Sequence, residues 1–463
     1  MSVDVESPTE HAIIGSADRA VGGVKQSSLL KDVLLTFAQQ WAALLIGILT
    51  SVVLARALGA EQLGIYRVAV LIPILIARLF DGGFSTANVY FVGSGTVSLR
   101  QACRFSMLYV AVVTAIAVPF VAMLVVYNGA WLLPHVPGHY IIIALLAFPC
   151  LLLTPMIRSL LQATRNFVAY NQSALCDSAM LFILILFMSF AFGINTLTTL
   201  VCMVIAQVCG LVITIAWLRG SSEPVGQGPS IAAYGRQAFS YGWKLHLSQF
   251  ANFLSYRADI LLLAVLVGPA IAGVYSVAVA LLERIGMLSQ AVQTAVLPRI
   301  AGAANAETLR GFTPKVCRCV LAATLVLALL VCIVGLPIVW LLYGQEYAEA
   351  YPIMLAMSPG IVALSASRTL ASDLVGRGLT TATCVASISA LIVNVVLNLC
   401  LIPRFGGIGA AVATSVSYSL MAAMIWISYL KASQVPWWSP LIPRLDELFS
   451  LIRVKSQGNV RLP

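Results

Sequence analysis

Long runs of apolar residues, separated by short polar, glycine or proline breaks, fill the sequence from residue 33 to residue 430. Each run approaches the roughly 20 residues that a helix needs to cross the hydrocarbon core of a bilayer. The runs lack the short alternating segments of a lipid-facing barrel, so all of them should be helical. We count twelve runs: 33–55, 64–92, 105–127, 140–161, 174–192, 196–217, 242–266, 271–297, 316–342, 350–372, 380–402 and 409–430.

The composition supports lipid as the solvent for most of the chain. Of the 463 residues, 60% are hydrophobic and only 10% are charged, and the mean hydropathy is +0.96. An average globular chain has roughly 45–50% apolar and about 25% charged residues, so a soluble protein of this composition would expose large aggregation-prone patches. We therefore predict an all-α polytopic membrane protein with about twelve transmembrane helices.

One stretch of the sequence occurs twice. Residues 58–70, LGAEQLGIYRVAV, and residues 267–279, VGPAIAGVYSVAV, are identical at six of the 13 aligned positions, with a shift of 209 residues between the copies. The longest polar gap between apolar runs, at 219–241, divides six predicted spans from the other six. A parallel repeat of this kind implies two bundles related by an axis along the membrane normal. We expect a six-helix lobe at 32–218, a cytoplasmic linker at 219–241 and a second six-helix lobe at 242–430.

Both ends of the chain are polar. Residues 1–31 lack the early, short apolar stretch of a signal peptide, so we expect a cytoplasmic tail there. Residues 431–463 follow the last span, and in them apolar residues recur at helical spacing beside basic ones: Leu445, Leu448, Phe449 and Ile452. This pattern predicts a short amphipathic helix on the inner leaflet, with an ordinary solvated tail as the alternative.

The basic residues indicate the orientation. With the N-terminus inside, 21 of the 27 Lys and Arg residues fall on the cytoplasmic side, and the outer side receives only Arg56, Arg67 and Arg404. Such an excess is typical of cytoplasmic segments, so we expect both termini in the cytoplasm. The same distribution explains the net charge of +10 without a nucleic-acid partner.

Three arginines fall inside predicted spans: Arg78, Arg257 and Arg284. An arginine at the centre of a membrane helix costs roughly 2.5–3.5 kcal/mol on insertion scales, so such residues usually face a partner or a water-filled cavity. None of the three recurs in the other copy of the repeat, which argues for a specialised role. A guanidinium group binds carboxylate or phosphate oxygens in pairs, so we predict a cavity for an anionic headgroup on an apolar tail.

Acidic residues accompany these arginines. Asp81 is three residues after Arg78, close enough on a helix to pair with it. Asp259 and Glu283 diverge from the arginines beside them in sequence, which leaves a structural pair between Asp259 and Arg284 open. Five amide side chains could add hydrogen bonds to a sugar, although contact between helices is the commoner role of such residues: Asn171, Gln172, Gln207, Asn394 and Asn398.

No pattern of catalysis, metal binding or cofactor binding stands out. The chain has no Gly-x-x-x-x-Gly-Lys-Ser/Thr loop, so we expect no nucleotide hydrolysis. His135 and His139 are four residues apart, but Pro137 and Gly138 interrupt the helix that such a metal site would need. The ten cysteines are scattered, mostly within apolar runs, and form no disulfide framework. We predict a protein that is not an enzyme and uses no cofactor.

Three motifs carry a resemblance to a known family. LARALGAEQLGIYRVAV at 54–70 resembles the first hairpin of the polysaccharide-synthesis transporters, the oligosaccharide-lipid flippases of the MOP exporter superfamily. RADILLLAVLVGPAIAGVYSVAV at 257–279 resembles their seventh and eighth spans, and LNLCLIPRFGGIGAAVATSVSY at 397–418 resembles their penultimate hairpin. The likeness covers most of residues 30–430, and it is specific for the family rather than for the substrate.

The resemblance implies a function and a mechanism. A member of this family would flip an undecaprenyl-diphosphate-linked oligosaccharide from the inner to the outer leaflet of the bacterial inner membrane, for O-antigen or exopolysaccharide assembly. It would act as a monomer, by alternating access between two six-helix lobes in a MATE-like V-shaped bundle, in contact with membrane lipids and a polysaccharide polymerase. Arg78, Arg257 and Arg284 would hold the diphosphate-sugar end, and Asp81, Asp259 or Glu283 would carry H⁺ or Na⁺ if transport is coupled to an ion gradient.

Two other functions remain open on the sequence. A cation-coupled multidrug exporter of the same superfamily would need an anionic cavity, against which the three arginines argue. A membrane scaffold of a polysaccharide-assembly complex would transport nothing, and neutralising Arg257 and Arg284 would then change nothing.

Overall fold

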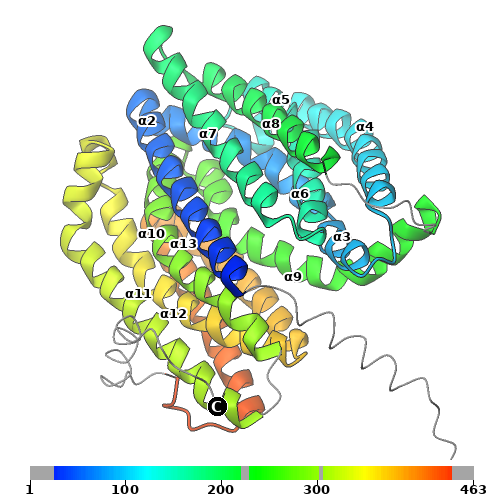
Figure 1. Cartoon of the computed structure of the whole chain (residues 1–463). Helices are drawn as coiled ribbons and strands as arrows, with labels where there is room; N and C mark the ends of the chain where they lie inside the picture. The colour runs from blue at the N-terminus through cyan, green and yellow to red at the C-terminus, as the bar shows by residue number, and fades with distance from the viewer. Residues whose placement is uncertain (1–25, 221–228, 302–305, 441–463) are drawn as a thin grey trace, which may run out of the picture.

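The computed structural model describes residues 26–220, 229–301 and 306–440, and these residues form an almost wholly helical bundle (Figure 1). Ten of the described helices are long and apolar enough to cross a membrane. Two of the ten, Trp41–Phe80 and Thr380–Ser433, contain a kink and therefore hold two spans each, which confirms the predicted twelve. The elements in chain order are α2 (Gln26–Phe80), α3 (Phe84–Gly93), α4 (Leu99–Leu132), α5 (Gly138–Leu145), α6 (Phe148–Ala163), α7 (Phe167–Ala191), α8 (Thr196–Arg219), α9 (Ile231–Leu266), α10 (Pro269–Ala301), α11 (Ala306–Leu342), η1 (Gln345–Tyr347), α12 (Ala350–Gly376) and α13 (Thr380–Ser433).

Glycine makes the two kinks possible. Gly59 in α2 and Gly406 in α13 have φ angles of +73° and +54°, a left-handed conformation that residues with a Cβ rarely adopt. In Figure 1, α2 runs to the upper left of the molecule and then turns back toward α3. Each glycine therefore joins two consecutive spans without a loop.

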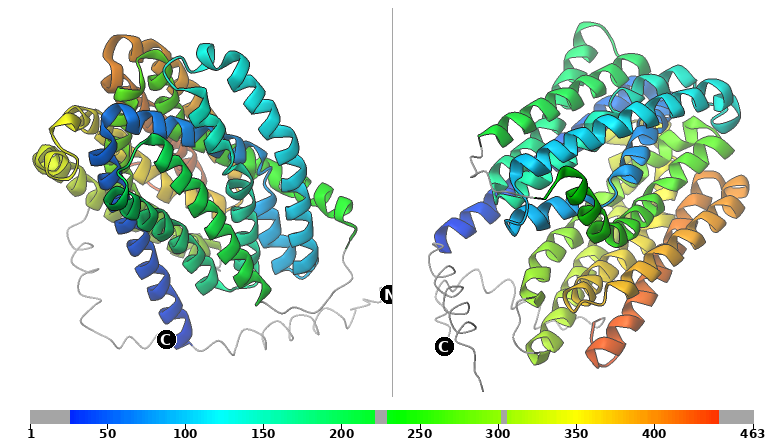
Figure 2. Two further views of the ribbon diagram at one scale, coloured as in Figure 1. Left: turned by 90° about the horizontal axis from the view of Figure 1, so that it is seen from above. Right: turned by 90° about the vertical axis from the view of Figure 1, so that its right-hand side faces the viewer.

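The connections between spans define two ends of the bundle. The kinks at Gly59 and Gly406 lie at one end with the α7–α8, α9–α10 and α11–α12 connections, and we call this the turn end. The helices of the chain begin near Gln26 and finish near Ser433 at the opposite end, which we call the terminal end. Figure 2 shows the long helices running between the two ends in both further views.

The two copies of the repeated stretch cross each other at the turn end. A Cβ on Gly64 of α2 would lie 1.8 Å from the carbonyl oxygen of Pro269, and a Cβ on Gly273 of α10 would lie 2.0 Å from that of Ala60. The 209-residue shift relates the two contacts, because it aligns Ala60 with Pro269 and Gly64 with Gly273. The repeat is therefore the place where the two halves of the chain meet, about an approximate two-fold axis.

Two predicted boundaries differ from those in the structure. The span predicted at 64–92 is interrupted, because α2 ends at Phe80 and α3 begins only at Phe84, after a glycine turn. The predicted linker at 219–241 ends early, because α9 already begins at Ile231.

Aromatic residues hold the first part of α9 against α3 and α4. Tyr234 is fully buried and donates a hydrogen bond of 2.6 Å to Oδ1 of Asn88. Its ring meets that of Phe105 edge-on at a centroid distance of 5.2 Å, and Tyr241 stacks on Tyr90 at 4.5 Å. These contacts explain the early start of α9, since the surrounding sequence is too polar to be recognised as part of a span.

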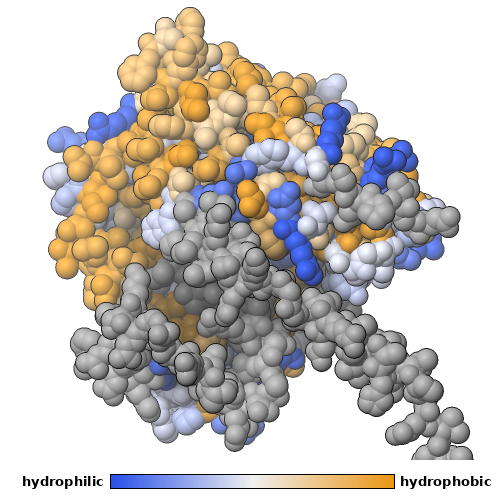
Figure 3. All heavy atoms as spheres, viewed as in Figure 1, coloured by the Kyte–Doolittle hydropathy of each residue, from blue (hydrophilic) through white to orange (hydrophobic). Residues whose placement is uncertain are grey.

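Apolar side chains cover much of the outside of the bundle. Ile116, Trp131 and Ile333 are 68%, 83% and 76% exposed, and Figure 3 shows apolar residues over most of the described surface on its upper and left sides. In water such a surface would aggregate, whereas in a bilayer it contacts lipid tails. The outside of the described bundle thus fits the predicted membrane environment.

Candidate functional site

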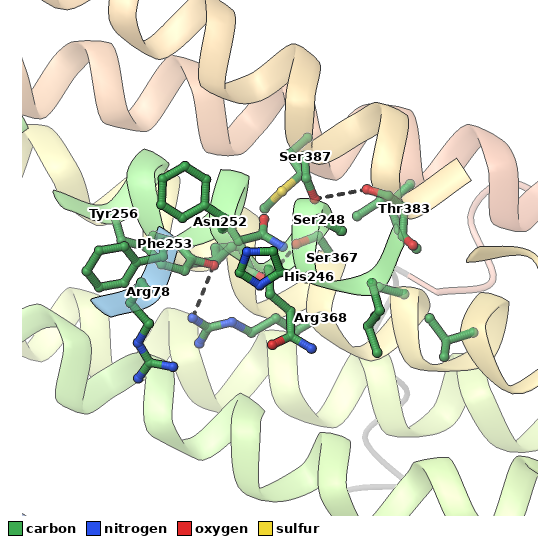
Figure 4. A pocket seen from close by; sticks show the side chains of 18 of the residues that line it. Arg78, His246, Ser248, Asn252, Phe253, Tyr256, Ser367, Arg368, Thr383 and Ser387 are labelled. Atoms are coloured by element: carbon green, nitrogen blue, oxygen red, sulfur yellow. Dashed lines mark hydrogen bonds between the residues drawn. The ribbon is translucent and has the colours of Figure 1, made fainter. Parts of the chain in front are cut away.

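A cavity of about 530 Å³ lies in the terminal half of the bundle. Its walls come from the end of α2, from α9 and α12, and from both spans of α13, so both halves of the chain contribute. The volume is within the roughly 300–1,000 Å³ typical of ligand-binding pockets. Its charged residues are Arg78, Asp81 and Arg368, with His246 beside them (Figure 4).

Arg78 and Arg368 direct their guanidinium groups to the same end of the cavity (Figure 4). Arg78 lies over the ring of Phe253 and Arg368 over that of Tyr256, each with its guanidinium carbon about 5.8 Å from the ring centroid. Arg368 also donates a hydrogen bond of 2.9 Å to the carbonyl of Gly286. Neither arginine forms an ion pair with a carboxylate in the described part of the chain, so both charges can act on an anion in the cavity.

Asp81 lines the cavity without pairing with Arg78, which corrects the predicted helical pair. The pairing required a continuous helix, but α2 ends at Phe80 and the chain turns there. The Oδ1 atom of Asp81 instead accepts a hydrogen bond of 2.5 Å from the Ser85 hydroxyl. The charge of Arg78 is therefore not neutralised by its neighbour.

Arg257 does not line this cavity, and it forms an ion pair with Glu283 of α10. The Nη1 atom of Arg257 lies 2.7 Å from Oε1 of Glu283, and its Nη2 atom lies 3.2 Å from Oε2. Such a bidentate pair satisfies both groups and fixes their relative geometry. This pair joins α9 to α10.

Arg284 lies where α10 contacts the first span of α2. Its Nη2 atom is 3.1 Å from the position that a Cβ on Gly47 would occupy. Arg284 does not line the cavity, and Asp259 accepts hydrogen bonds from Tyr275 and Thr414, with no ion pair to Arg284 among the described residues.

Asp259 is the centre of a buried polar cluster between α9, α10 and α13. It is 1% exposed, and it accepts hydrogen bonds from the hydroxyls of Tyr275 and Thr414, the latter at 3.4 Å. Asn394 donates to Oγ1 of Thr414 at 3.4 Å, and Asn398 donates to Oδ1 of Asn394 at 3.0 Å. Two of the five predicted amide residues thus serve this cluster rather than the cavity.

The Asp259 cluster offers oxygen atoms of the kind that a hard cation binds. The Oδ1 atom of Asn398 is buried and has no hydrogen-bond partner among the described residues, and Asp259 forms no ion pair with any of them. One carboxylate with neutral amide and hydroxyl oxygens suits a small monovalent cation or a proton. Across the described ranges, no group of three or more His, Cys, Asp or Glu residues could hold a metal ion.

Sequence reasoning missed Arg368. The tenth span was predicted at 350–372 and Arg368 was assigned to the cytoplasmic side, whereas α12 continues to Gly376. Arg368 is therefore about two helical turns from the end of α12 and faces the cavity. The signal that could have revealed it is the polar face of this span, on which serines surround the arginine.

The amides that line the cavity are Gln249 and Asn252 of α9, which the sequence did not single out. The predicted Asn171, Gln172 and Gln207 do not line it. The cavity-lining amides were overlooked because they belong to the least apolar of the ten described helices that are long enough to cross a membrane.

Reciprocal contacts close the turn end. Arg56 of α2 donates a hydrogen bond of 2.7 Å to the carbonyl of Leu342, the last residue of α11. Glu346 accepts a hydrogen bond of 2.7 Å from the backbone N–H of Ala60, which follows the kink in α2. A cation thus caps a helix C-terminus and a carboxylate caps a helix N-terminus, and both contacts complement the helix dipoles. They hold the two halves of the chain together at the end opposite the cavity.

These features define the class of the protein as an all-α, multi-span membrane protein with a MATE- and MurJ-like fold. A solved structure described as lipid II flippase MurJ in an inward closed conformation matches with a TM-score of 0.73 and 14% identity, over 93% of this chain and 94% of that chain. An inward-facing multidrug resistance MATE family transporter of the MOP superfamily matches with a TM-score of 0.65 and 13% identity, over 87% and 98%. The Vibrio cholerae MATE transporter VcmN in the bent form matches with a TM-score of 0.57 and 18% identity, over 88% and 98%.

The sequence itself matches two family models. The model described as polysaccharide biosynthesis protein matches residues 29–303, and the model described as MatE matches residues 245–400. Because the first match spans more than half of the chain, this protein belongs to the polysaccharide biosynthesis protein family. A search of curated protein sequences found no match. The predicted fold and family are thereby confirmed.

Proposed function

We propose that this protein flips an undecaprenyl-diphosphate-linked oligosaccharide from the inner to the outer leaflet of the bacterial inner membrane, for the assembly of O-antigen or exopolysaccharide. The observation that carries the proposal is the cavity with the guanidinium groups of Arg78 and Arg368 at one end, neither of which forms an ion pair with a described carboxylate. Guanidinium groups bind phosphate oxygens in pairs, so two of them suit a diphosphate. The apolar exterior leaves the polyprenyl tail in lipid while the polar end occupies the cavity.

Alternating access follows from the closed turn end and the cavity at the terminal end. The basic residues favour the terminal end as the cytoplasmic side. In that orientation the substrate enters from the cytoplasmic leaflet while Arg56 and Glu346 keep the outer side closed. Release to the outer leaflet requires these contacts to open and the cavity to close at the terminal end.

The Asp259 cluster would couple this cycle to an ion. It brings α9, α10 and α13 together around one buried carboxylate, so Na⁺ or H⁺ bound there would favour the arrangement in which Asp259, Asn394 and Thr414 are close. Arg257 and Glu283, which satisfy each other, serve as a structural pair beside it. This assignment differs from the expectation that all three intramembrane arginines hold the substrate.

The test is flipping of a fluorescent undecaprenyl-diphosphate-linked sugar by the purified protein in liposomes. We expect Arg78→Ala and Arg368→Ala each to slow flipping by about tenfold or more, because each removes a hydrogen-bonded charge. The matched control is Arg404→Ala, since Arg404 is exposed and lies outside the cavity. Wild-type flipping by the double variant of Arg78 and Arg368 would refute the proposed site.

The same liposomes distinguish the other two functions. A multidrug exporter would move a cationic dye, which the cationic end of the cavity should repel, so we expect no dye transport by the wild type. A scaffold would flip nothing in isolation, and its arginine variants would support polymer assembly in cells as well as the wild type does.

A further inference from the structure

The cavity has a second end, lined by uncharged polar side chains. Thr383 and Ser387 come from the first span of α13. Ser248, Gln249 and Asn252 of α9 line the same cavity, and Figure 4 shows Ser248 and Asn252 between Tyr256 and Thr383. Figure 4 shows Thr383 and Ser387 at the end of the cavity away from Arg78 and Arg368. On α9 the spacing of three and four residues places Ser248, Gln249 and Asn252 on adjoining parts of one helix face. Two polar rows therefore face the same space from different helices.

These side chains have unused hydrogen-bonding capacity. The amides of Gln249 and Asn252 bond to no other residue that the structure describes, and each amide offers two donors and an acceptor. The hydroxyl of Ser387 donates to the carbonyl of Thr383 at 2.9 Å, and that of Thr383 donates to the carbonyl of Thr380 at 2.8 Å. Both hydroxyl oxygens keep lone pairs that can accept from a ligand. A ligand for this end must therefore offer both donors and acceptors.

We infer that this end of the cavity binds the sugar part of the substrate, and that it selects uncharged sugars. The inference rests on the proposed function, which assigns the diphosphate to Arg78 and Arg368. The hydroxyl and acetamido groups of a sugar supply both donors and acceptors. The amides of Gln249 and Asn252 can bond to both kinds of group, and the hydroxyl oxygens of α13 can accept from the donors. A ligand that lacks these sugar groups would leave the polar side chains of the site without hydrogen-bond partners. The site therefore discriminates against such a ligand.

The selection against acidic sugars follows from the charges of the cavity. The diphosphate occupies both guanidinium groups, and Asp81 is the only carboxylate among the residues that line the described cavity. His246 stacks on Phe250 and lies 3.2 Å from the carbonyl oxygen of Leu79, a contact to which its ring contributes an N–H. With both guanidinium groups bound to the diphosphate, a sugar carboxylate would find no further arginine or lysine to pair with among the residues that line the described cavity.

The experiment measures binding of three lipids to the purified full-length protein in detergent. The probes are undecaprenyl diphosphate, the same lipid carrying N-acetylglucosamine, and the same lipid carrying glucuronic acid. The test variant is Gln249→Ala with Asn252→Ala, and the matched control is Gln237→Ala, an exposed amide on the same helix outside the cavity. We expect the wild type to bind the N-acetylglucosamine lipid more tightly than the other two.

The double variant should lose about tenfold or more in affinity for the N-acetylglucosamine lipid and keep its affinity for undecaprenyl diphosphate. Gln237→Ala should bind all three lipids like the wild type. Equal binding of undecaprenyl diphosphate and the N-acetylglucosamine lipid by the wild type would overturn the sugar site while leaving the diphosphate site in place. Equal binding of the two sugar-bearing lipids would overturn the selection of uncharged sugars. Failure of the wild type to bind any of the three would overturn the proposed function itself.

Discussion

The crossing of the two repeats makes a quantitative prediction about the turn end. Replacing Gly273 with alanine would place a Cβ 2.0 Å from the carbonyl oxygen of Ala60, a backbone atom that cannot rotate away. The closest ordinary contact between a carbon and a carbonyl oxygen is about 3.3 Å, so α2 and α10 must separate by about 1.3 Å. Forcing such a group into a packed contact typically costs about 1–3 kcal/mol. This cost falls only on the arrangement in which the turn end is closed.

We therefore expect Gly273→Ala to shift the population by a factor of roughly 5 to 150 toward the arrangement with the turn end open. Gly64→Ala should do the same, because its Cβ would lie 1.8 Å from the carbonyl oxygen of Pro269 in the equivalent contact. The double variant should cost little more than either single variant, since one separation of the helices relieves both clashes.

The assay is the distance between spin labels at Phe192 and Glu349, exposed residues at the turn end of the two halves. Both glycine variants should populate a longer distance than the wild type and flip substrate more slowly. Gly129→Ala in α4 is the matched control, because its Cβ would make only an ordinary contact of 3.6 Å with Val125. A wild-type distance distribution in Gly273→Ala, with wild-type flipping, would refute the reasoning.

Three further predictions follow from the contacts described above. Glu346→Gln and Arg56→Ala each weaken a charge-assisted hydrogen bond across the turn end. Each should destabilise the closed arrangement by about 1 kcal/mol and so increase the population with a longer distance between the two spin labels. Asp259→Asn removes the only charge of the buried cluster, so flipping by this variant should lose any dependence on Na⁺ or pH while the affinity for the lipid stays within about twofold. Arg257→Ala should lower the melting temperature by leaving Glu283 without its partner, and the added change Glu283→Ala should recover most of the loss; equal melting temperatures of the single and double variants would contradict the pairing.

The sequence predicted the spans well because length and hydropathy decide whether a segment crosses a membrane. The runs around Gly59 and Gly406 were divided correctly because glycine interrupts two long apolar stretches, and the structure places a left-handed residue at each. The predictions failed where helix length and hydropathy disagree. Residues 231–241 are too polar to resemble a span, yet Tyr234 is buried against α3 and α4 and extends α9.

The residues of the candidate site were predicted less well, because the sequence shows which side chains are charged but not which side chains they contact. Arg257 and Arg78 both appear in the sequence as single arginines inside a span. Only the tertiary structure shows that Arg257 forms an ion pair with Glu283, whereas Arg78 lies over the ring of Phe253. Arg368 was missed because its span was predicted to end at residue 372, which put Arg368 next to the cytoplasmic side, whereas α12 continues to Gly376. A shift of one helical turn thus decides whether a residue is assigned to a loop or to a cavity. Of the three arginines predicted to hold the substrate, Arg78 lines the cavity, and Asp81, predicted for ion coupling or charge pairing, lines it as well.

The repeat shows where the two halves of the chain have kept a common role and where they have not. Gly64 and Gly273 occupy equivalent positions in the two copies and make equivalent contacts, so the two halves contribute equally where α2 and α10 cross. Asp259 is equivalent to Thr50, whose hydroxyl is satisfied by the carbonyl of Ile46 in its own helix, so only the second half has a buried carboxylate there. A ligand shifts a conformational equilibrium only through different affinities for the two states. A cation bound beside Asp259 would act within the second half, whereas a diphosphate bound by Arg78 and Arg368 would contact both halves. The glycines that the two copies share thus allow the helices to approach closely at the turn end. The residues that differ between the copies would let substrate and ion shift the equilibrium between the closed and open arrangements.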